Sequence, residues 1–192
     1  MKRFLLLIAF ACLAILIAAC GSNELEDTLD WEVQSFEGTT QEGEHFSTDD
    51  MEGEVWLANF IFTNCNTVCP PMTRNMAQVQ EQLKEEGVDA QIVSFSVDPT
   101  VDHPDVLKEF GKQHGADFSN WTFVTEYTQE EIKNFAQESF QTIAVKTEGN
   151  DQVDHGTSFY LIGKDGLVKK KYMGNMEVPF EQIVEDTKTL AN

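Results

Sequence analysis

The feature that most constrains the fold is an apolar strand that leads into a cysteine-containing turn and then into a helix. Residues 55–62 form a near-continuous apolar run of strand length, as expected for a strand covered on both faces. Cys65 and Cys69 follow, and Pro70 and Pro71 fit only the first turn of a helix. Apolar residues then recur every three or four positions, which predicts an amphipathic helix. A strand, turn and helix of this kind form the opening unit of an α/β sheet.

The rest of the chain continues this alternation. Two short extended pieces within 33–46 predict an N-terminal hairpin. Asp102 and Pro104 are expected to open a second helix, and Thr128 and Glu131 have capping-box spacing for a third. Further strands are predicted at 90–97, 121–124, 158–162 and 167–172, and further helices at 106–114, 128–139 and 180–190. The order predicts an α/β, thioredoxin-like fold with an N-terminal β-hairpin extension.

The N-terminus has the layout of a secretory signal peptide, in which positive charges precede a short apolar run. The run is shorter than the roughly 20 residues that a membrane-spanning helix needs. It closes on Ala18-Ala19-Cys20, which resembles the bacterial lipobox, so we expect Cys20 to carry a lipid. The alternative is an uncleaved N-terminal anchor, and in both cases the rest of the chain lies outside the cytoplasm. We therefore predict a signal peptide at 1–19, a lipidated cysteine with an acidic tether at 20–30, and one folded domain at 31–192, held by its lipid on the extracytoplasmic face of a bacterial cell membrane.

The charge balance excludes one class of partner. Lys2 and Arg3 are the only charges in 1–19, so removing that segment leaves 11 Lys and Arg against 33 Asp and Glu, a net charge of −22. Phosphates would be repelled, which argues against nucleic acid and against direct binding of anionic lipid head groups. The acidity serves either solubility or a basic partner surface, and the sequence does not separate these two roles.

The cysteine count indicates a functional pair. Cys12 leaves with the signal peptide and Cys20 takes the lipid, so Cys65 and Cys69 are the two thiols of the folded domain. A disulfide between them would close a tiny loop and would gain little of the entropy that makes structural disulfides useful. Residues at i and i+4 share one helix face, and a helix N-terminus lowers thiol pKa. Thiolates placed there can bind metal or exchange with disulfides, and the spacing alone leaves both functions open.

A metal site would need a third ligand, and four histidines are available. His45, His103 and His114 are expected to be surface residues. His155 differs, because it lies just before an apolar strand, in a loop that packs against the cysteine turn in the thioredoxin plan. Thioredoxin-like reductases carry a cis-proline in that loop, whereas this chain has no proline between Pro104 and Pro179.

Three motifs together resemble the Sco/SenC family, named for synthesis of cytochrome c oxidase. They are Phe-Ile-Phe-Thr-Asn-Cys-Asn-Thr-Val-Cys-Pro at 60–70, Ser-Val-Asp-Pro at 96–99 and Asp-His-Gly-Thr-Ser-Phe at 154–159. The resemblance covers about 30–190. It implies a thioredoxin fold and a copper site formed by Cys65, Cys69 and His155. It also implies a role in metallating the binuclear copper centre of cytochrome c oxidase subunit II. Asp98 matches the second motif, where its role is open and capping is the simplest explanation.

The chemistry of the donor set agrees with that resemblance. Thiolates and imidazole suit Cu(I), Cu(II) and also Zn(II). Structural zinc normally takes four protein ligands. Three ligands therefore favour an open site from which copper can be transferred, and oxidation of the cysteines to a disulfide would release it.

Three other functions compete with copper delivery. The first is a thiol–disulfide oxidoreductase that keeps the cysteines of the oxidase reduced, in partnership with a thiol reductant protein. The three-residue spacer between the cysteines counts against it, because thioredoxins have two residues there. The second is a peroxide-reducing or redox-sensing protein, but Phe62 stands where such peroxidases need Thr or Ser. The third is a purely structural extracellular module. We expect an assembly factor rather than a turnover enzyme.

Overall fold

The central strand of the molecule is β4 (Trp56–Ile61), in which every residue is buried. A computed structural model describes residues 25–65, 67–146, 149 and 151–192. β4 pairs in parallel with β5 (Gln91–Ser96), and β5 pairs in parallel with β6 (Trp121–Thr125). Parallel strands of this kind are apolar on both faces because helices cover both sides of the sheet.

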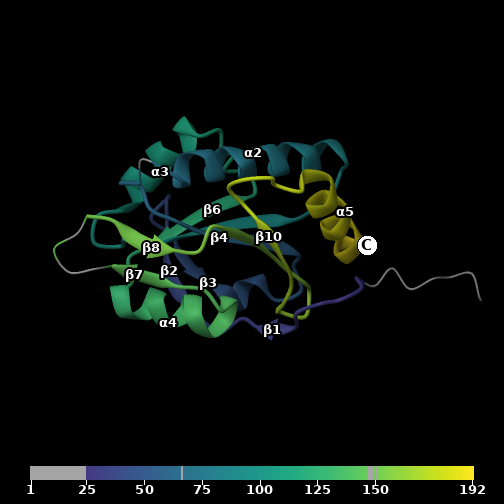
Figure 1. Cartoon of the computed structure of the whole chain (residues 1–192), viewed down its shortest axis with the longest axis horizontal. Helices are drawn as coiled ribbons and strands as arrows, with labels where there is room; N and C mark the ends of the chain where they lie inside the picture. Colours follow the sequence, from purple (N-terminus) through teal and green to yellow (C-terminus); the bar gives the residue numbers. More distant parts are fainter. Residues whose placement is uncertain (1–24, 66, 147–148, 150) are drawn as a thin grey trace, which may run out of the picture.

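Helices follow each of these three strands. They are α2 (Cys69–Glu85), α3 (Pro104–Gln113) and α4 (Gln129–Phe140), and a fourth, α5 (Phe180–Ala191), closes the chain. Figure 1 shows α2 along one side of the sheet and α4 along the other. The predicted apolar face of α2 is confirmed, since Met72, Met76, Val79 and Leu83 are all buried. The capping box at Thr128 and Glu131 is also confirmed.

Antiparallel strands complete the sheet. β9 (Ser158–Ile162) pairs with β4 and with β10 (Leu167–Met173), as the hairpin pattern predicts. The predicted N-terminal hairpin consists of β2 (Glu37–Thr40) and β3 (His45–Ser47), followed by the short 3-10 helix η1 (Thr48–Met51), and β2 joins the sheet beside β6. The strand order is β1-β10-β9-β4-β5-β6-β2-β3. This is a thioredoxin-like α/β fold with an N-terminal hairpin extension, as predicted.

Three features differ from the sequence-based expectation. The segment expected to be a loop before β9 contains a small second sheet, β7 (Ala144–Lys146) paired with β8 (Val153–His155). β1 (Trp31–Glu32), which pairs with β10, was not predicted either. Strands of two or three residues carry too little periodicity to be recognised. Finally, His103 and not Asp102 occupies the N-cap position of α3, because the Asp102 side chain is used inside the protein.

The start of the described chain lies on β10. The Leu29 backbone N–H donates to the Lys169 carbonyl (3.0 Å), and the Lys169 ammonium pairs with Asp30 (2.8 Å). The predicted signal peptide 1–19 and Cys20 lie outside the described residues, so the boundaries at 19 and 30 stay predictions. Within the part of the chain that the structure describes, no helix has the length and apolar character needed to cross a membrane.

Candidate metal centre

Cys65 and Cys69 lie between the carboxyl end of β4 and the first turn of α2. Both are buried and both are free thiols. Cys69 is the first residue of α2, where backbone N–H groups have no partner within the helix. One of these groups, the Cys69 N–H, donates to the Cys65 sulfur over 3.3 Å. The start of the helix is therefore directed at the Cys65 sulfur. Cys65 itself precedes α2, so the prediction from the i and i+4 spacing that both cysteines share one helix face is wrong.

His155 reaches the same place from the small second sheet. It is the last residue of β8, and its Nε2 lies 3.3 Å from the Cys69 sulfur, although the two residues are 86 positions apart in the sequence. Its other ring nitrogen, Nδ1, lies 2.9 Å from the Gly156 carbonyl oxygen. A carbonyl oxygen only accepts, so Nδ1 carries a proton, and Nε2 is the ring nitrogen that faces the Cys69 sulfur. An imidazole oriented in this way is a ready metal ligand.

The two thiols have opposite protonation tendencies. Burial raises the pKa of Cys65, but hydrogen bonds from His155 and from the Cys69 N–H outweigh it, and together they lower that pKa to about 5. Burial dominates at Cys69 and raises its pKa far above the ordinary value, and the neighbouring Cys65 adds to this rise. Near neutral pH the site therefore holds one thiolate, at Cys65, beside one thiol, at Cys69.

Packing around the three side chains restricts their movement. The His155 ring contacts Phe62 edge to face, with 5.6 Å between ring centroids. The side chain of Gln152, in the segment leading into β8, donates to the Asn64 carbonyl (3.3 Å). This bond joins that segment to the loop between β4 and α2 that carries Cys65, which we call the cysteine loop. Among residues 25–65, 67–146, 149 and 151–192, no three His, Cys, Asp or Glu side chains lie close enough together to hold a metal ion as they stand. The pairwise contacts of Cys69 with Cys65 and His155 are thus the geometry on which a ligand assignment rests.

The remaining histidines lie elsewhere. His45 and His103 are exposed, as expected, and His114 is half-buried beside Arg74. Asp98, whose role the sequence left open, is 1 % exposed and forms an ion pair with Lys146 (Nζ to Oδ1, 2.6 Å). It therefore neutralises a cation of β7 and does not cap a helix.

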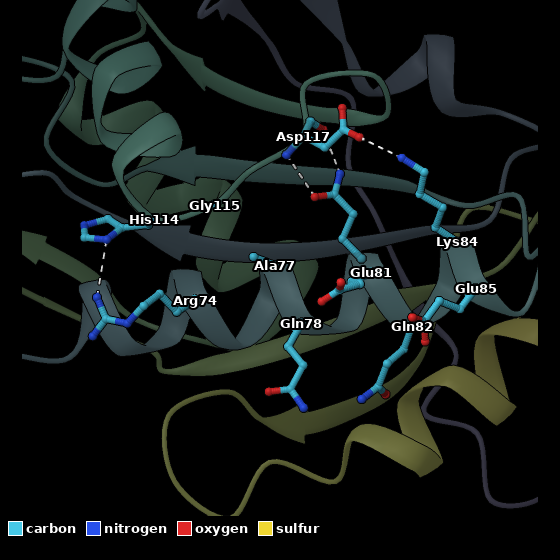
Figure 2. Close-up of a pocket in the computed structure, with 11 residues that line it drawn as sticks. Arg74, Ala77, Gln78, Glu81, Gln82, Lys84, Glu85, His114, Gly115 and Asp117 are labelled. Carbon is cyan, nitrogen blue, oxygen red and sulfur yellow. Dashed lines mark hydrogen bonds and ion pairs between the residues drawn. The ribbon is translucent and has the colours of Figure 1, made fainter.

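A groove lies away from the cysteines. It has a volume of about 960 Å³ and runs along the exposed side of α2, as Figure 2 shows. Charges of both signs line it, including an ion pair between Lys84 and Asp117 and a hydrogen bond from Arg74 to His114. Neither the cysteines nor His155 line this groove, so it is no part of the cysteine–histidine site.

Sequence reasoning missed three residues that support the site. Thr63 and Asp102 hydrogen-bond across the cysteine loop, and Lys146 holds β7. The only sequence signal was Asp102 beside the Ser-Val-Asp-Pro motif, and it was read as a helix start. Contacts between residues 39 to 48 positions apart leave no periodic trace in the sequence.

Three solved structures resemble this chain closely enough to inform its family. A SCO1/SenC family lipoprotein from Bacillus anthracis str. Ames is 49 % identical, with 88 % of this chain and 100 % of that chain covered and a TM-score of 0.85. BsSco, in which a disulfide switch was identified, is a member of the Sco family of cytochrome c oxidase assembly proteins; it is 47 % identical, with 87 % and 97 % covered and a TM-score of 0.81. Arabidopsis thaliana ScoI, solved with copper bound, is 26 % identical, with 80 % and 96 % covered and a TM-score of 0.67.

The family model for SCO1/SenC matches residues 26–192, which is nearly the whole of the described chain. The resemblance seen in the three sequence motifs is therefore confirmed over the full domain. On the agreement of the family model, the solved relatives and the fold, this chain belongs to the SCO1/SenC family.

Proposed function

We propose that this chain binds copper through Cys65, Cys69 and His155 and delivers it during assembly of cytochrome c oxidase, at the binuclear copper site of subunit II. The observation that carries this proposal is the contact of 3.3 Å between the Cys69 sulfur and His155 Nε2. The contact joins distant parts of the chain next to the Cys65 sulfur, and the other ring nitrogen, Nδ1, is occupied by the Gly156 carbonyl.

The donor set fits copper. Two sulfurs and one imidazole are ligands that Cu(I) and Cu(II) accept, and three protein ligands leave a position open for transfer to a partner. The copper-bound structure of the Arabidopsis relative supports the same cargo here. Oxidation of Cys65 and Cys69 to a disulfide would withdraw both thiolates, which gives the site a way to let the metal go. The partner that receives copper would be subunit II of the oxidase.

The predicted lipid anchor suits such a role. The described chain starts on β10, near the turn at Gly166, whereas the cysteines follow the carboxyl end of β4. β9 runs antiparallel to β4, so Ile162, next to that turn, pairs with Trp56 at the start of β4. The first described residues and the metal centre then lie near opposite ends of a strand about 20 Å long. A lipid at Cys20 would hold the domain at a membrane.

A second candidate function has its own support. A low-pKa thiolate at Cys65 beside a protonated Cys69 is the asymmetry that a thiol–disulfide oxidoreductase uses. In that role the chain would keep the copper-ligand cysteines of the oxidase reduced, with a thiol reductant protein regenerating it. The disulfide switch identified in BsSco favours keeping this candidate. The two roles are compatible in one protein.

An anaerobic copper titration of the reduced domain, 31–192, tests the proposal. We expect one equivalent to bind, with a sulfur-to-copper charge-transfer band for Cu(II), and no tight binding after oxidation to the Cys65–Cys69 disulfide. Equal affinity before and after reduction would contradict a site made of these thiolates. Rapid thiol–disulfide exchange without copper binding would instead support the oxidoreductase function.

A further inference from the structure

The turn that follows β5, residues 98–102, contacts both halves of the candidate metal centre, and we call it the anchoring turn. The Val101 and Asp102 N–H groups both donate to the Asp98 carbonyl, over 3.0 and 2.9 Å, which closes the turn. The carboxylates at its two ends, Asp98 and Asp102, are 1 % and 0 % exposed. Two buried carboxylates are thus held at a fixed separation beside the site.

Asp102 holds the cysteine loop. Its carboxylate accepts the Thr63 N–H with both oxygens (3.2 Å each) and the Thr63 hydroxyl with Oδ1 (2.5 Å). The Ser96 hydroxyl donates to Oδ2 over 2.6 Å and ties the same carboxylate to the end of β5. Thr63 lies two residues before Cys65. Since a buried carboxylate is costly unless its oxygens are hydrogen-bonded, these bonds hold the loop in one position.

Asp98 holds the strands that carry His155. The Lys146 ammonium of β7 pairs with Asp98 Oδ1 over 2.6 Å, and the Thr100 hydroxyl donates to the same oxygen over 2.8 Å. β7 in turn pairs with β8, where Ala144 lies opposite His155. A two-stranded sheet of three residues a strand is marginal by itself, so a largely buried ion pair is a substantial part of what fixes it.

We propose that the anchoring turn positions the two halves of the metal centre through separate contacts, Asp102 through Thr63 for the cysteine loop and Asp98 through Lys146 for the strands that carry His155. The inference rests on the proposed function, in that it explains how ligands from distant parts of the chain come into register for one ion. Asp98, Asp102, Thr63 and Lys146 are positioning residues and need not touch copper.

The experiment breaks each anchor separately. Lys146→Met removes the ammonium and keeps an unbranched stem, and Thr63→Val removes the hydroxyl donor and keeps the side-chain shape. Asp102→Asn is the stronger test of the contact between Asp102 and Thr63. Thr63→Val covers the case in which Asp102→Asn does not fold. Lys84→Met is the matched control, because Lys84 also forms an ion pair, with Asp117 (3.2 Å), in the groove of Figure 2.

Amide hydrogen exchange of the reduced, metal-free domain is the first readout. We expect Lys146→Met to speed exchange in 144–146 and 153–155 by about tenfold, with the amides of 63–69 unchanged. Thr63→Val and Asp102→Asn should do the reverse, and Lys84→Met should alter neither segment. A merely destabilising change would speed exchange in both segments together, which would overturn the proposal, as would no change in either.

Copper binding is the second readout. Each anchor variant should weaken the affinity for Cu(II) by about 10- to 100-fold, as is usual for residues that orient metal ligands. In the electron paramagnetic resonance spectrum, the hyperfine coupling between Cu(II) and the imidazole nitrogen should weaken in Lys146→Met and persist in Thr63→Val. Anchor variants that bind copper as Lys84→Met does would overturn the proposal. If the wild-type domain binds no copper, the proposed function fails, and the exchange measurement still decides whether the anchoring turn acts on each half.

Discussion

Replacing His155 by alanine separates copper binding from thiol exchange. In the metal-free protein the substitution removes one sulfur–nitrogen contact (3.3 Å) and one edge-to-face contact with Phe62. His155 is half-buried, and a thiol is a weak donor, so the free energy of unfolding should fall by only about 1 kcal/mol. For a domain of this size that corresponds to about 2–4 °C in melting temperature.

The effect on the copper-loaded protein should be larger. At a free copper concentration 1,000 times the dissociation constant, binding stabilises the native state by about 4.1 kcal/mol. Loss of one of three ligands should weaken binding by at least about 100-fold, which leaves about 1.4 kcal/mol of that stabilisation. The difference of about 2.7 kcal/mol predicts that the copper-induced rise in melting temperature shrinks by about 5–10 °C.

The assay is thermal unfolding with and without copper, joined to oxidase assembly in cells. His114→Ala is the matched control, since His114 is also half-buried and also contacts a phenylalanine edge to face, Phe110 at 4.5 Å, but does not contact the cysteines. It should keep the full copper-induced rise. If His155→Ala also keeps the rise and supports oxidase assembly while Cys65→Ser or Cys69→Ser fails, the pair acts by thiol exchange and the ranking of the two functions is wrong.

Three further predictions concern the thiols, the strand that carries His155 and the N-terminus. Because hydrogen bonds lower the pKa of Cys65 to about 5, iodoacetamide should alkylate reduced Cys69→Ser at a rate that is flat between pH 6 and 8 and declines only as the pH falls through about 5. Cys65→Ser should stay unreactive near neutral pH, because the pKa of Cys69 is raised. An inflection near the ordinary thiol pKa of about 8.5 in Cys69→Ser would refute the assignment. A Cβ at Gly156 would overlap the Thr142 side chain, so Gly156→Ala should destabilise the domain by about 1–3 kcal/mol in urea unfolding and weaken copper binding by moving His155; wild-type stability and affinity would show that the segment adapts freely. Cys20→Ala should abolish incorporation of radioactive palmitate into the full chain, and absence of label in the wild type would show that the lipoprotein prediction is wrong.

Most of the sheet and its helices could be predicted because their signals are local. The apolar run that became β4, the periodic apolar face of α2 and the capping box of α4 each depend on residues within one or two helical turns or one strand. β7 and β8 could not be predicted in this way, because three-residue strands have no measurable period and form only where packing brings them together.

Asp102 shows the same limit in a functional position. Next to Pro104 its sequence context is that of a helix N-cap, and a free carboxylate would serve there. In the folded protein the carboxylate instead accepts hydrogen bonds from Thr63 and Ser96, where burial makes each of those bonds matter more. A local rule cannot choose between a cap and a partner 39 residues away.

By itself the sequence indicated the type of site, since two cysteines precede two prolines at the start of a helix and so lie at its positive end. It also singled out His155, through the strand that follows it and the family motifs. Only the tertiary structure decided that His155 Nε2 meets Cys69, that Nδ1 meets the Gly156 carbonyl, and that the pKa of Cys65 is the one that is lowered. Those outcomes depend on burial and on hydrogen bonds between distant segments, and both arise only when the sheets pack.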